Sequence, residues 1–407
     1  MADDGRRFRC AGCGAKLKLP PEIDPTQARC PRCGQGLDVR TASGFNKGTN
    51  LGPYQILRPI GKGAMGTVYE CAGGDPPGQR KAIKVMKREI AQRSSLLARF
   101  QREGRVGMQI SHPNVVATFD AGEDQGLYYM VMEFIDGLSL ADNVKRDGAL
   151  SWRRGLRFTR QIASALVLMG EKNIIHRDIK PQNIMIAPDD TAKLADFGLS
   201  KIIGGEEKQA EYVDLTMTGT KMGTPVYMPP EQIEDASRAT ATADIYSLGA
   251  TMFFLVTGRR PFEDKGAVRI MQKVLNEPAP RASDYNADVP AGIDELLLWC
   301  MAKDSYDRPA SAEVLLETCK QLAVAPENAD IVLSQRAVIA AERERAERAR
   351  IKAERGGGGR LIMILLVLMI LLGVAVALYW FVLREQYPIP FIEDLIGGQA
   401  AEQGAAE

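Results

Sequence analysis

Two short polar runs constrain this chain more than any other feature. The run from His176 to Asn183 has the sequence His-Arg-Asp-Ile-Lys-Pro-Gln-Asn, and a second run, Asp-Phe-Gly, begins at Asp196. Carboxylate and amide oxygens are suitable ligands for Mg²⁺, and the lysine adds fixed positive charge. Phosphoryl transfer needs these groups held together, so the two runs predict a phosphotransferase site.

A glycine-rich segment upstream fits the nucleotide half of such a site. From Gly61 to Val68 the sequence is Gly-Lys-Gly-Ala-Met-Gly-Thr-Val. Glycines let a hairpin backbone lie close to phosphates, and the β-branched residues that follow predict a strand, whereas dinucleotide-binding loops lead into a helix. The expected nucleotide contacts are Gly61, Lys62, Gly63, Gly66 and Val68.

A lysine interrupts the next apolar run, at Lys84 between Ile83 and Val85. An ammonium inside a short strand is costly unless it meets phosphate or carboxylate. Glu103, in a helical segment over residues 94–108, can supply the carboxylate. We therefore expect a Lys84–Glu103 pair that directs the lysine toward the α and β phosphates.

With these residues in place, the chain resembles the bacterial eukaryotic-like (Hanks-type) Ser/Thr protein kinases over residues 54–322. The resemblance implies an α+β fold of two lobes, β-rich in the N-terminal lobe and α-helical in the C-terminal lobe. It implies that Asp178 is the catalytic base and that Lys180 steadies the γ-phosphate of ATP. Asn183 and Asp196 would hold Mg²⁺, and Lys180 favours Ser and Thr acceptors in protein substrates.

Further family landmarks follow in order. Glu133 falls at the adenine-side hinge, and Glu231 and Arg308 are expected to form a buried ion pair with a structural role. The segment before Glu231 ends in Met-Pro-Pro-Glu where the family has Ala-Pro-Glu. This departure changes local packing and retains the glutamate.

Two glycines, Gly104 and Gly107, follow the pairing Glu103 in its helix. Each glycine weakens a helix interior by roughly 0.8–1 kcal/mol relative to alanine. We therefore expect a labile helix that lets Glu103 leave its partner when the protein is unphosphorylated.

Several threonines lie between Asp196 and Glu231. Aligned on the family, Thr216 and Thr218 resemble activating phosphorylation sites, and Arg177 is the cation that would pair with a phosphate and order the loop. A simple abundance of Thr in a loop is the alternative.

The N-terminal region carries two Cys-x-x-Cys motifs, Cys10 with Cys13 and Cys30 with Cys33. This spacing predicts a closed four-sulfur Zn²⁺ site in a zinc ribbon over residues 1–46, with metal binding supplying the folding energy of so small a module. Two disulfides are disfavoured, because the kinase domain must face cytosolic ATP.

The ribbon is also basic, through Arg6, Arg7, Arg9, Lys16, Lys18, Arg29 and Arg32. Nucleic-acid binding is less favoured than a protein-binding or regulatory role, because no aromatic stacking platform accompanies these charges beyond Phe8. A zinc-ribbon nucleic-acid factor held at the membrane remains as an alternative class.

An uncharged apolar run extends from Leu361 to Leu383 and is long enough to cross a bilayer as a helix. Basic residues crowd its N-terminal side, which predicts a single-pass anchor in the plasma (inner) membrane with the kinase domain in the cytoplasm. Residues 384–407 would form a short outer tail. Residues 323–360 would form a juxtamembrane helix, broken by the glycines at 356–359, through which a homodimer could form.

The formal net charge of +1 over 407 residues conceals an unequal distribution of basic and acidic residues along the chain. A chain of this length has room for one two-lobed domain, a zinc module and an anchor. The main rival to an active enzyme is a catalytically silent kinase-fold scaffold. That rival predicts a missing lysine or aspartate, whereas Lys84, Asp178, Asn183 and Asp196 are all present.

Overall fold

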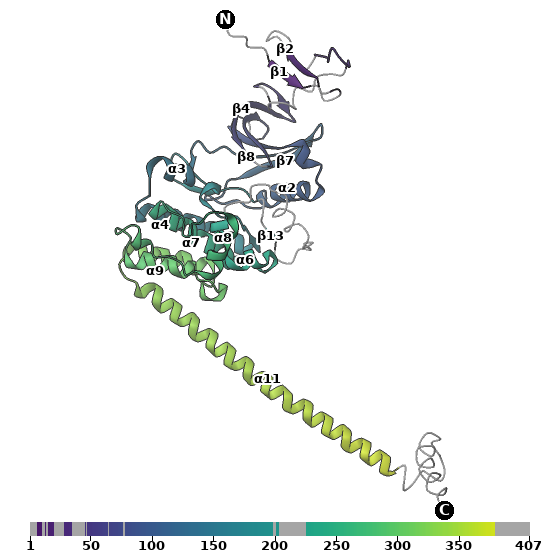
Figure 1. Ribbon diagram of the computed structural model, residues 1–407, viewed down its shortest axis with the longest axis vertical. Helices are drawn as coiled ribbons and strands as arrows, with labels where there is room; N and C mark the ends of the chain where they lie inside the picture. The colour runs from purple at the N-terminus through teal and green to yellow at the C-terminus, as the bar shows by residue number, and fades with distance from the viewer. Residues whose placement is uncertain are drawn as a thin grey trace, which may run out of the picture. The chain divides into compact units, whose positions relative to one another are not determined.

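The computed structural model describes residues 6–9, 13, 15–19, 28–34, 45, 47–63, 65–75, 78–197, 201–202 and 225–378. The chain divides into two compact units, Met1–Ala337 and Val338–Glu407 (Figure 1). Cys10 and the expected phosphorylation sites Thr216 and Thr218 lie outside the described residues, as does the expected outer tail.

A six-stranded antiparallel sheet in the order β3-β4-β5-β6-β8-β7 forms the N-terminal lobe. Its strands are β3 (Asn50–Leu51), β4 (Tyr54–Lys62), β5 (Gly66–Gly73), β6 (Lys81–Met86), β7 (Thr118–Asp124) and β8 (Leu127–Glu133). Alternate residues of β8 join two different clusters, as the pleat of a strand requires. Val131 packs with Ile56 and Ile83, whereas Met130 packs with Phe100 of α2 (Ser94–Gly107). The short helix α1 (Arg88–Ala91) precedes α2.

Helices build the C-terminal lobe (Figure 1). They are α3 (Leu140–Asp147), α4 (Trp152–Glu171), α6 (Pro230–Glu234), α7 (Ala241–Thr257), α8 (Ala267–Asn276), α9 (Ala291–Cys300) and α10 (Ala312–Val324). Helix α7 is apolar and buried on nearly every side, which is typical of a central helix. Serine side chains at Ser139, Ser151 and Ser311 cap three of the helices by accepting backbone N–H groups. The two-lobed α+β fold expected from the sequence is confirmed.

Short strands flank the two polar runs. Strands β9 (Leu138–Ser139), β11 (Ile184–Ile186) and β12 (Ala192–Leu194) form one small sheet, and β10 (Ile174–Ile175) pairs with β13 (Lys201–Ile202). The run from His176 to Asn183, which is the expected catalytic loop, therefore lies between β10 and β11, and Asp196 follows β12.

The N-terminal cysteine region contains a hairpin of β1 (Arg6–Arg9) and β2 (Lys16–Leu19), in which Arg6 lies opposite Leu19. Cys30 is buried against Cys13, Ala15, Leu17 and Ala28, a cluster too small to be a conventional hydrophobic core.

Helix α11 (Asp330–Leu378) begins within the first unit. There Val332 is fully buried, the Gln335 amide oxygen accepts from the Thr318 hydroxyl at 3.1 Å, and Arg336 lies 3.4 Å from Glu295. These contacts carry the packed domain beyond the expected end at residue 322.

The expected helix break at the four glycines of residues 356–359 is wrong, because α11 continues through them. Glycine weakens a helix by about 1 kcal/mol per residue but keeps the backbone N–H that proline lacks. Flanking helix formers can therefore carry a helix through a glycine run.

No helix among the described residues combines the length and the apolar composition needed to cross a membrane. The expected span from Leu361 to Leu383 is thus not confirmed. Its residues after Leu378, and the side chains of residues 361–365, lie outside the described part of the chain.

Candidate active site

A buried carboxylate on α7 holds the start of the catalytic loop. The two oxygens of Asp244 accept the backbone N–H groups of His176 and Arg177, each at 2.8 Å. Arg177 has a φ of +65°, so the chain turns sharply at this point. Burial raises the pKa of Asp244, and the two backbone donors and nearby His176 oppose that shift.

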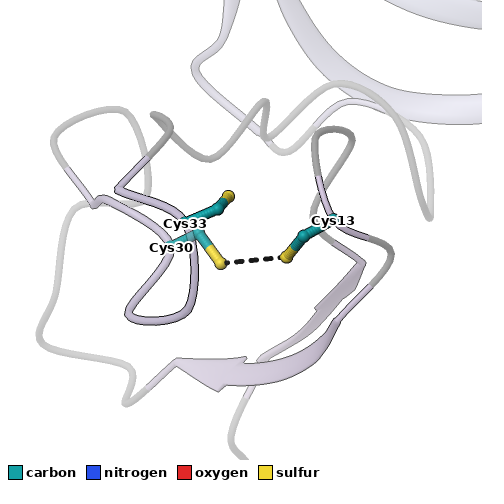
Figure 2. A group of neighbouring side chains, drawn as sticks. All are labelled: Cys13, Cys30 and Cys33. Atoms are coloured by element: carbon teal, nitrogen blue, oxygen red, sulfur yellow. Dashed lines mark hydrogen bonds between the residues drawn. The ribbon is translucent and has the colours of Figure 1, made fainter.

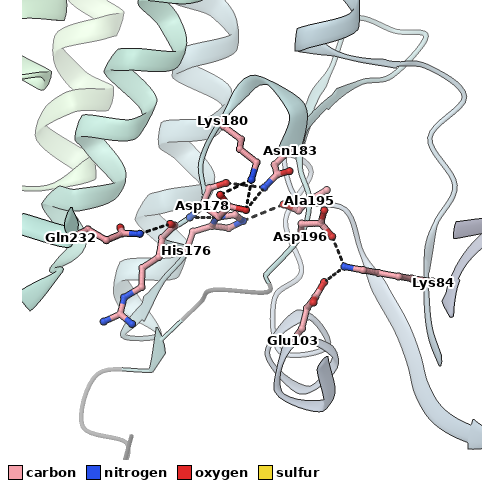
Figure 3. Close-up of polar contacts among 10 residues, drawn as sticks. Lys84, Glu103, His176, Asp178, Lys180, Asn183, Ala195, Asp196 and Gln232 are labelled. Carbon is pink, nitrogen blue, oxygen red and sulfur yellow. Dashed lines mark hydrogen bonds and ion pairs between the residues drawn. The ribbon is translucent and has the colours of Figure 1, made fainter. Parts of the chain in front are cut away.

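The His176 ring supports both polar runs at once (Figure 3). Its Nδ1 accepts the Asp178 N–H at 3.3 Å, which leaves Nε2 to donate to the Ala195 carbonyl at 3.2 Å. Burial lowers the pKa of His176, which keeps the ring neutral as these two contacts require. The ring therefore links the catalytic loop to the residue that precedes Asp196.

Three polar side chains of the catalytic loop converge (Figure 3). Lys180 Nζ donates to both carboxylate oxygens of Asp178 at 2.7 Å. Asn183 Nδ2 donates to the Asp178 carbonyl at 2.8 Å and to its Oδ2 at 2.9 Å. The 3₁₀ turn Pro181–Asn183 brings the amide back toward the aspartate. The carboxylate is thus held in one orientation by two neighbours.

Lys84 on β6 lies between two carboxylates of the site. Its Nζ lies 2.7 Å from Glu103 Oε1 on α2 and 2.7 Å from Asp196 Oδ1 (Figure 3). Lys84 lowers the pKa of Asp196 to about 2. Burial would lower the pKa of Lys84, but Asp196 and Glu103 raise it overall. The structure thus brings together the pair expected from the sequence and adds Asp196 to it.

The three glycines of the glycine-rich hairpin have different surroundings. A Cβ on Gly66 would lie 2.1 Å from the Val85 carbonyl oxygen, so only glycine fits against β6 there. Gly61 and Gly63 have more open surroundings, with the nearest contacts at 3.9 Å and 3.7 Å. Gly61 pairs with Val68 across the hairpin, and Lys62 is exposed. This leaves the hairpin tip accessible to a ligand.

The Glu133 side chain faces a partner that the sequence did not suggest. Lys193 Nζ on β12 lies 2.9 Å from Glu133 Oε1, and the Ala117 N–H donates to Oε2 at 3.3 Å. Opposite charges sixty residues apart give no sequence signal of their pairing. The Gln232 amide donates to the Arg177 carbonyl at 3.1 Å (Figure 3). The sequence did not suggest this contact either, because the two residues lie far apart along the chain.

Glu231 of α6 and Arg308 lie in contact in the C-terminal lobe, with two hydrogen bonds of 2.7 Å. Arg308 is fully buried, and Glu231 is 9% exposed. The pair is separate from the polar groups around Asp178, which fits the structural role expected for it.

Three cysteines converge in the N-terminal region (Figure 2). The sulfur atoms of Cys13, Cys30 and Cys33 all lie within 4.8 Å of one another, with 3.6 Å between Cys13 and Cys30. Three sulfur atoms at this separation can ligate one metal ion, and the expected fourth ligand, Cys10, lies outside the described residues.

Comparison with known proteins connects this geometry to one family. The family model described as "Protein kinase domain" matches residues 54–318. The crystal structure of the Mycobacterium tuberculosis PknI kinase domain shares the fold, with a TM-score of 0.54 and 24% identity, over 68% of this chain and 99% of that one.

Curated relatives match the same region. Serine/threonine-protein kinase PrkC of Bacillus subtilis is 36% identical over 262 residues, which cover 64% of this chain and 39% of the relative. Probable serine/threonine-protein kinase PknB of Lactococcus lactis is 34% identical over 263 residues, 65% of this chain and 41% of the relative. PknE of Mycobacterium bovis is 35% identical over 283 residues, 68% and 48% of the two chains. The chain thus spans less than half the length of these relatives.

Proposed function

Because this chain belongs to the protein kinase family, we propose that it transfers the γ-phosphate of ATP to Ser and Thr hydroxyls of protein substrates. The observation that carries the proposal is the bridge from Glu103 through Lys84 to Asp196 at 2.7 Å on each side. The ordered Asp178 carboxylate completes the set of groups that phosphoryl transfer needs.

The residues present fit ATP and Mg²⁺. Asp196 and Asn183 supply oxygen ligands of the kind Mg²⁺ prefers, and the Asp196 side chain is 48% exposed, so it can be reached. Lys84 would hold the α and β phosphates, and the hairpin containing Gly61, Lys62, Gly63, Gly66 and Val68 would cover them. Bound Mg²⁺ would neutralise the charge that develops on the phosphoryl oxygens.

The proposed chemical roles follow from charge and position. Asp178 accepts the proton of the attacking Ser or Thr hydroxyl, and Lys180 offers positive charge beside it for the γ-phosphate. Asn183 keeps the Asp178 carboxylate oriented through a 2.9 Å hydrogen bond. Glu133 contributes to the adenine-side hinge, where its carboxylate is held by Lys193.

A catalytically silent scaffold does not require this grouping of charged side chains. The Lys84 ammonium, the Asp178 carboxylate and the Asp196 carboxylate each have partners suited to catalysis. Placing three charged groups together without a reaction to perform adds desolvation cost and no stability. The geometry therefore favours an active enzyme.

Incubation of the purified full chain with Mg-ATP and a mixed protein acceptor tests the proposal. We expect phosphate on Ser and Thr of the acceptor, and a loss of at least about 10³-fold in rate for Asp178→Asn, the order of effect given by removal of a catalytic base. Arg238→Ala, at an exposed ion pair with Glu234, is the matched control and should retain the rate. An equal rate for wild type and Asp178→Asn would contradict the proposal.

We further propose that Thr216 or Thr218 is an activating phosphorylation site. Arg177 lies in the catalytic loop, and a phosphate of about −1.5 to −2 charge units would find a cation there. Phosphorylation would then order the segment that leads to Glu231.

A zinc module at the N-terminus is the second part of the proposal. Cys13, Cys30 and Cys33 support it by their 4.8 Å grouping, and Cys10 would be the fourth ligand. A four-thiolate site has no open position, so the ion would be structural. We propose a protein-binding role for this module in preference to nucleic-acid binding.

The third part is a single-pass membrane anchor over Leu361–Leu383, with the kinase domain cytoplasmic and residues 384–407 outside the inner membrane. The uncharged run and the basic residues before it support this proposal. Leu368→Arg with Leu371→Arg should move the chain out of carbonate-washed membranes, whereas Val338→Arg should not. A chain that pellets equally in all three forms, or in none, would contradict the anchor. Pairing of two chains through residues 323–360 remains a hypothesis within the proposal.

A further inference from the structure

Two glycines of α2 lie against strand β7 at distances that no side chain can occupy. A Cβ on Gly104 would lie 2.8 Å from the Cβ of Ala121. A Cβ on Gly107 would lie 2.3 Å from Thr118 Oγ1 and 3.0 Å from Thr118 Cβ. Both glycines are buried, so the helix backbone rests directly on the strand.

The atoms that oppose these glycines cannot easily move aside. The Cβ of Ala121 is attached to the sheet backbone, and Thr118 is β-branched, with a restricted χ1. An added Cβ must therefore displace the helix, by several tenths of an ångström at Gly104 and by about 1 Å at Gly107, since packed interiors have few voids to absorb the added volume.

The same contacts lie next to the Lys84–Glu103 pair. On the helix, Glu103 directly precedes Gly104. On the sheet, strand pairing links Ala121 of β7 to Lys84 of β6 through β8. Ala121 pairs with Met130, and Met130 pairs with Lys84 on the next strand. The distance from the helix to β7 therefore determines whether Glu103 Oε1 reaches Lys84 Nζ at 2.7 Å.

We propose that Gly104 and Gly107 are positioning residues that set the depth of α2 on β7, so that Glu103 reaches Lys84. The inference rests on the proposed kinase function and extends it to two buried glycines that pack against β7. A displacement of about 1 Å would stretch the 2.7 Å bond beyond the usual hydrogen-bond range.

This role predicts the opposite of helix lability. If the glycines served only to loosen the helix, alanine would strengthen it and raise basal activity, because alanine is the better helix former. If they set the packing depth, alanine lowers activity despite its better propensity. The sign of one substitution thus separates the two hypotheses.

The experiment compares Gly104→Ala and Gly107→Ala in the full chain by initial rates of phosphate incorporation. We expect a fall of about 10- to 100-fold in rate, as for other misplacements near 1 Å. Gly170→Ala is the matched control, since Gly170 is an exposed glycine of helix α4 with nothing within 4 Å of an added Cβ. It should leave the rate unchanged.

Compensating glycines on β7 make the test specific. Ala121→Gly combined with Gly104→Ala, and Thr118→Gly combined with Gly107→Ala, each restore the missing space. We expect each double variant to be faster than its helix single variant, with Ala121→Gly and Thr118→Gly alone as controls for strand weakening. The strand single variants measure the loss from weakening β7 alone, so a double variant that is faster than its helix single variant shows that the restored space recovers the rate.

Thermal unfolding of the same variants separates the inference from the proposed function. If the wild type itself transfers no phosphate, the proposed function fails, and the inference is judged by melting temperature. Lower melting temperatures for the two helix variants, raised again by their compensating glycines, support close packing. Unchanged or higher rates and melting temperatures in Gly104→Ala and Gly107→Ala would overturn it.

Discussion

The guanidinium of Arg308 donates through its two terminal nitrogens to the two oxygens of Glu231, each at 2.7 Å. Its remaining N–H groups meet the carbonyls of Ala302, Thr242 and Lys303, so a fully buried arginine has every donor satisfied. The pair joins α6 to the segment before α10. It therefore fixes Glu231, where the threonine-containing segment after Asp196 ends, to the helical lobe.

Removal of one partner of this pair should destabilise the domain strongly. Arg308→Ala leaves Glu231 buried without its cation, which should cost roughly 3–5 kcal/mol of unfolding free energy. Urea denaturation of the full chain measures this loss. The control is Arg238→Ala, whose exposed pair with Glu234 at 3.1 Å should contribute less than about 1 kcal/mol. Equal losses in both variants would show that burial of the pair is irrelevant.

The two histidines of the chain should titrate below their ordinary range. Burial lowers the pKa of His176 and of His112 from 6.5. Unfolded histidines take up protons as pH falls through 6.5 while the folded ones do not, so stability is lost below that pH. NMR titration of the two imidazole signals should give both midpoints under 6.5. A midpoint at or above 6.5 would contradict the lowered pKa of that imidazole.

Lys303 should have the same kind of effect in a higher pH range. Burial, with nearby Arg308, lowers the pKa of Lys303 from 10.5 to about 8. The unfolded lysine therefore holds its proton between pH 8 and 10.5 while the folded one loses it, so wild-type stability rises across that window. Unfolding free energies of wild type minus Lys303→Met should rise from pH 8 to 10. The same difference for Lys320→Met, at an exposed position on α10, is the control. A difference in unfolding free energy between wild type and Lys303→Met that does not change with pH would show that the Lys303 charge is well solvated.

Zinc content tests the cysteine cluster directly. The full chain should carry one equivalent of zinc by elemental analysis, and Cys13→Ser and Cys30→Ser should each lower it. Cys319→Ala removes a buried thiol from α10, outside the cluster, and should keep the zinc. Zinc absent from the wild type, or equally retained by every variant, would contradict the proposed module.

Several features of the site were predictable from the sequence for physical reasons. Lys84 stood out because an isolated charge in a strand needs a partner. The roles of Asp178 and Asp196 came instead from the resemblance of the two polar runs to the kinase family. A charged residue inside an apolar run can be recognised in a sequence because burial of an unpaired charge costs free energy.

Other features depend on tertiary packing that the sequence does not display. The glycines at 104 and 107 suggested a weak helix, yet their surroundings show close contact with Thr118 and Ala121. The pairing of Glu133 with Lys193 depends on how two distant strands approach each other. Helix propensity describes one segment alone, whereas these contacts arise between segments.

Packing contacts also extend beyond both ends of the resemblance. Leu51 forms part of an additional edge strand and is fully buried, although the resemblance began at Tyr54. At the other end, buried Val332 shows that the packed domain continues into α11. Short segments with one or two apolar residues give no periodicity, so their burial is visible only in the fold.

Phosphosite mapping by mass spectrometry, after the full chain is incubated with Mg-ATP, tests the central claim most directly, with Asp178→Asn as the control. The account predicts phosphate on Thr216 or Thr218 in the wild type and none in the variant. Phosphate on neither chain would contradict self-activation at these threonines, and the same phosphosites on both chains would contradict the role of Asp178 as catalytic base.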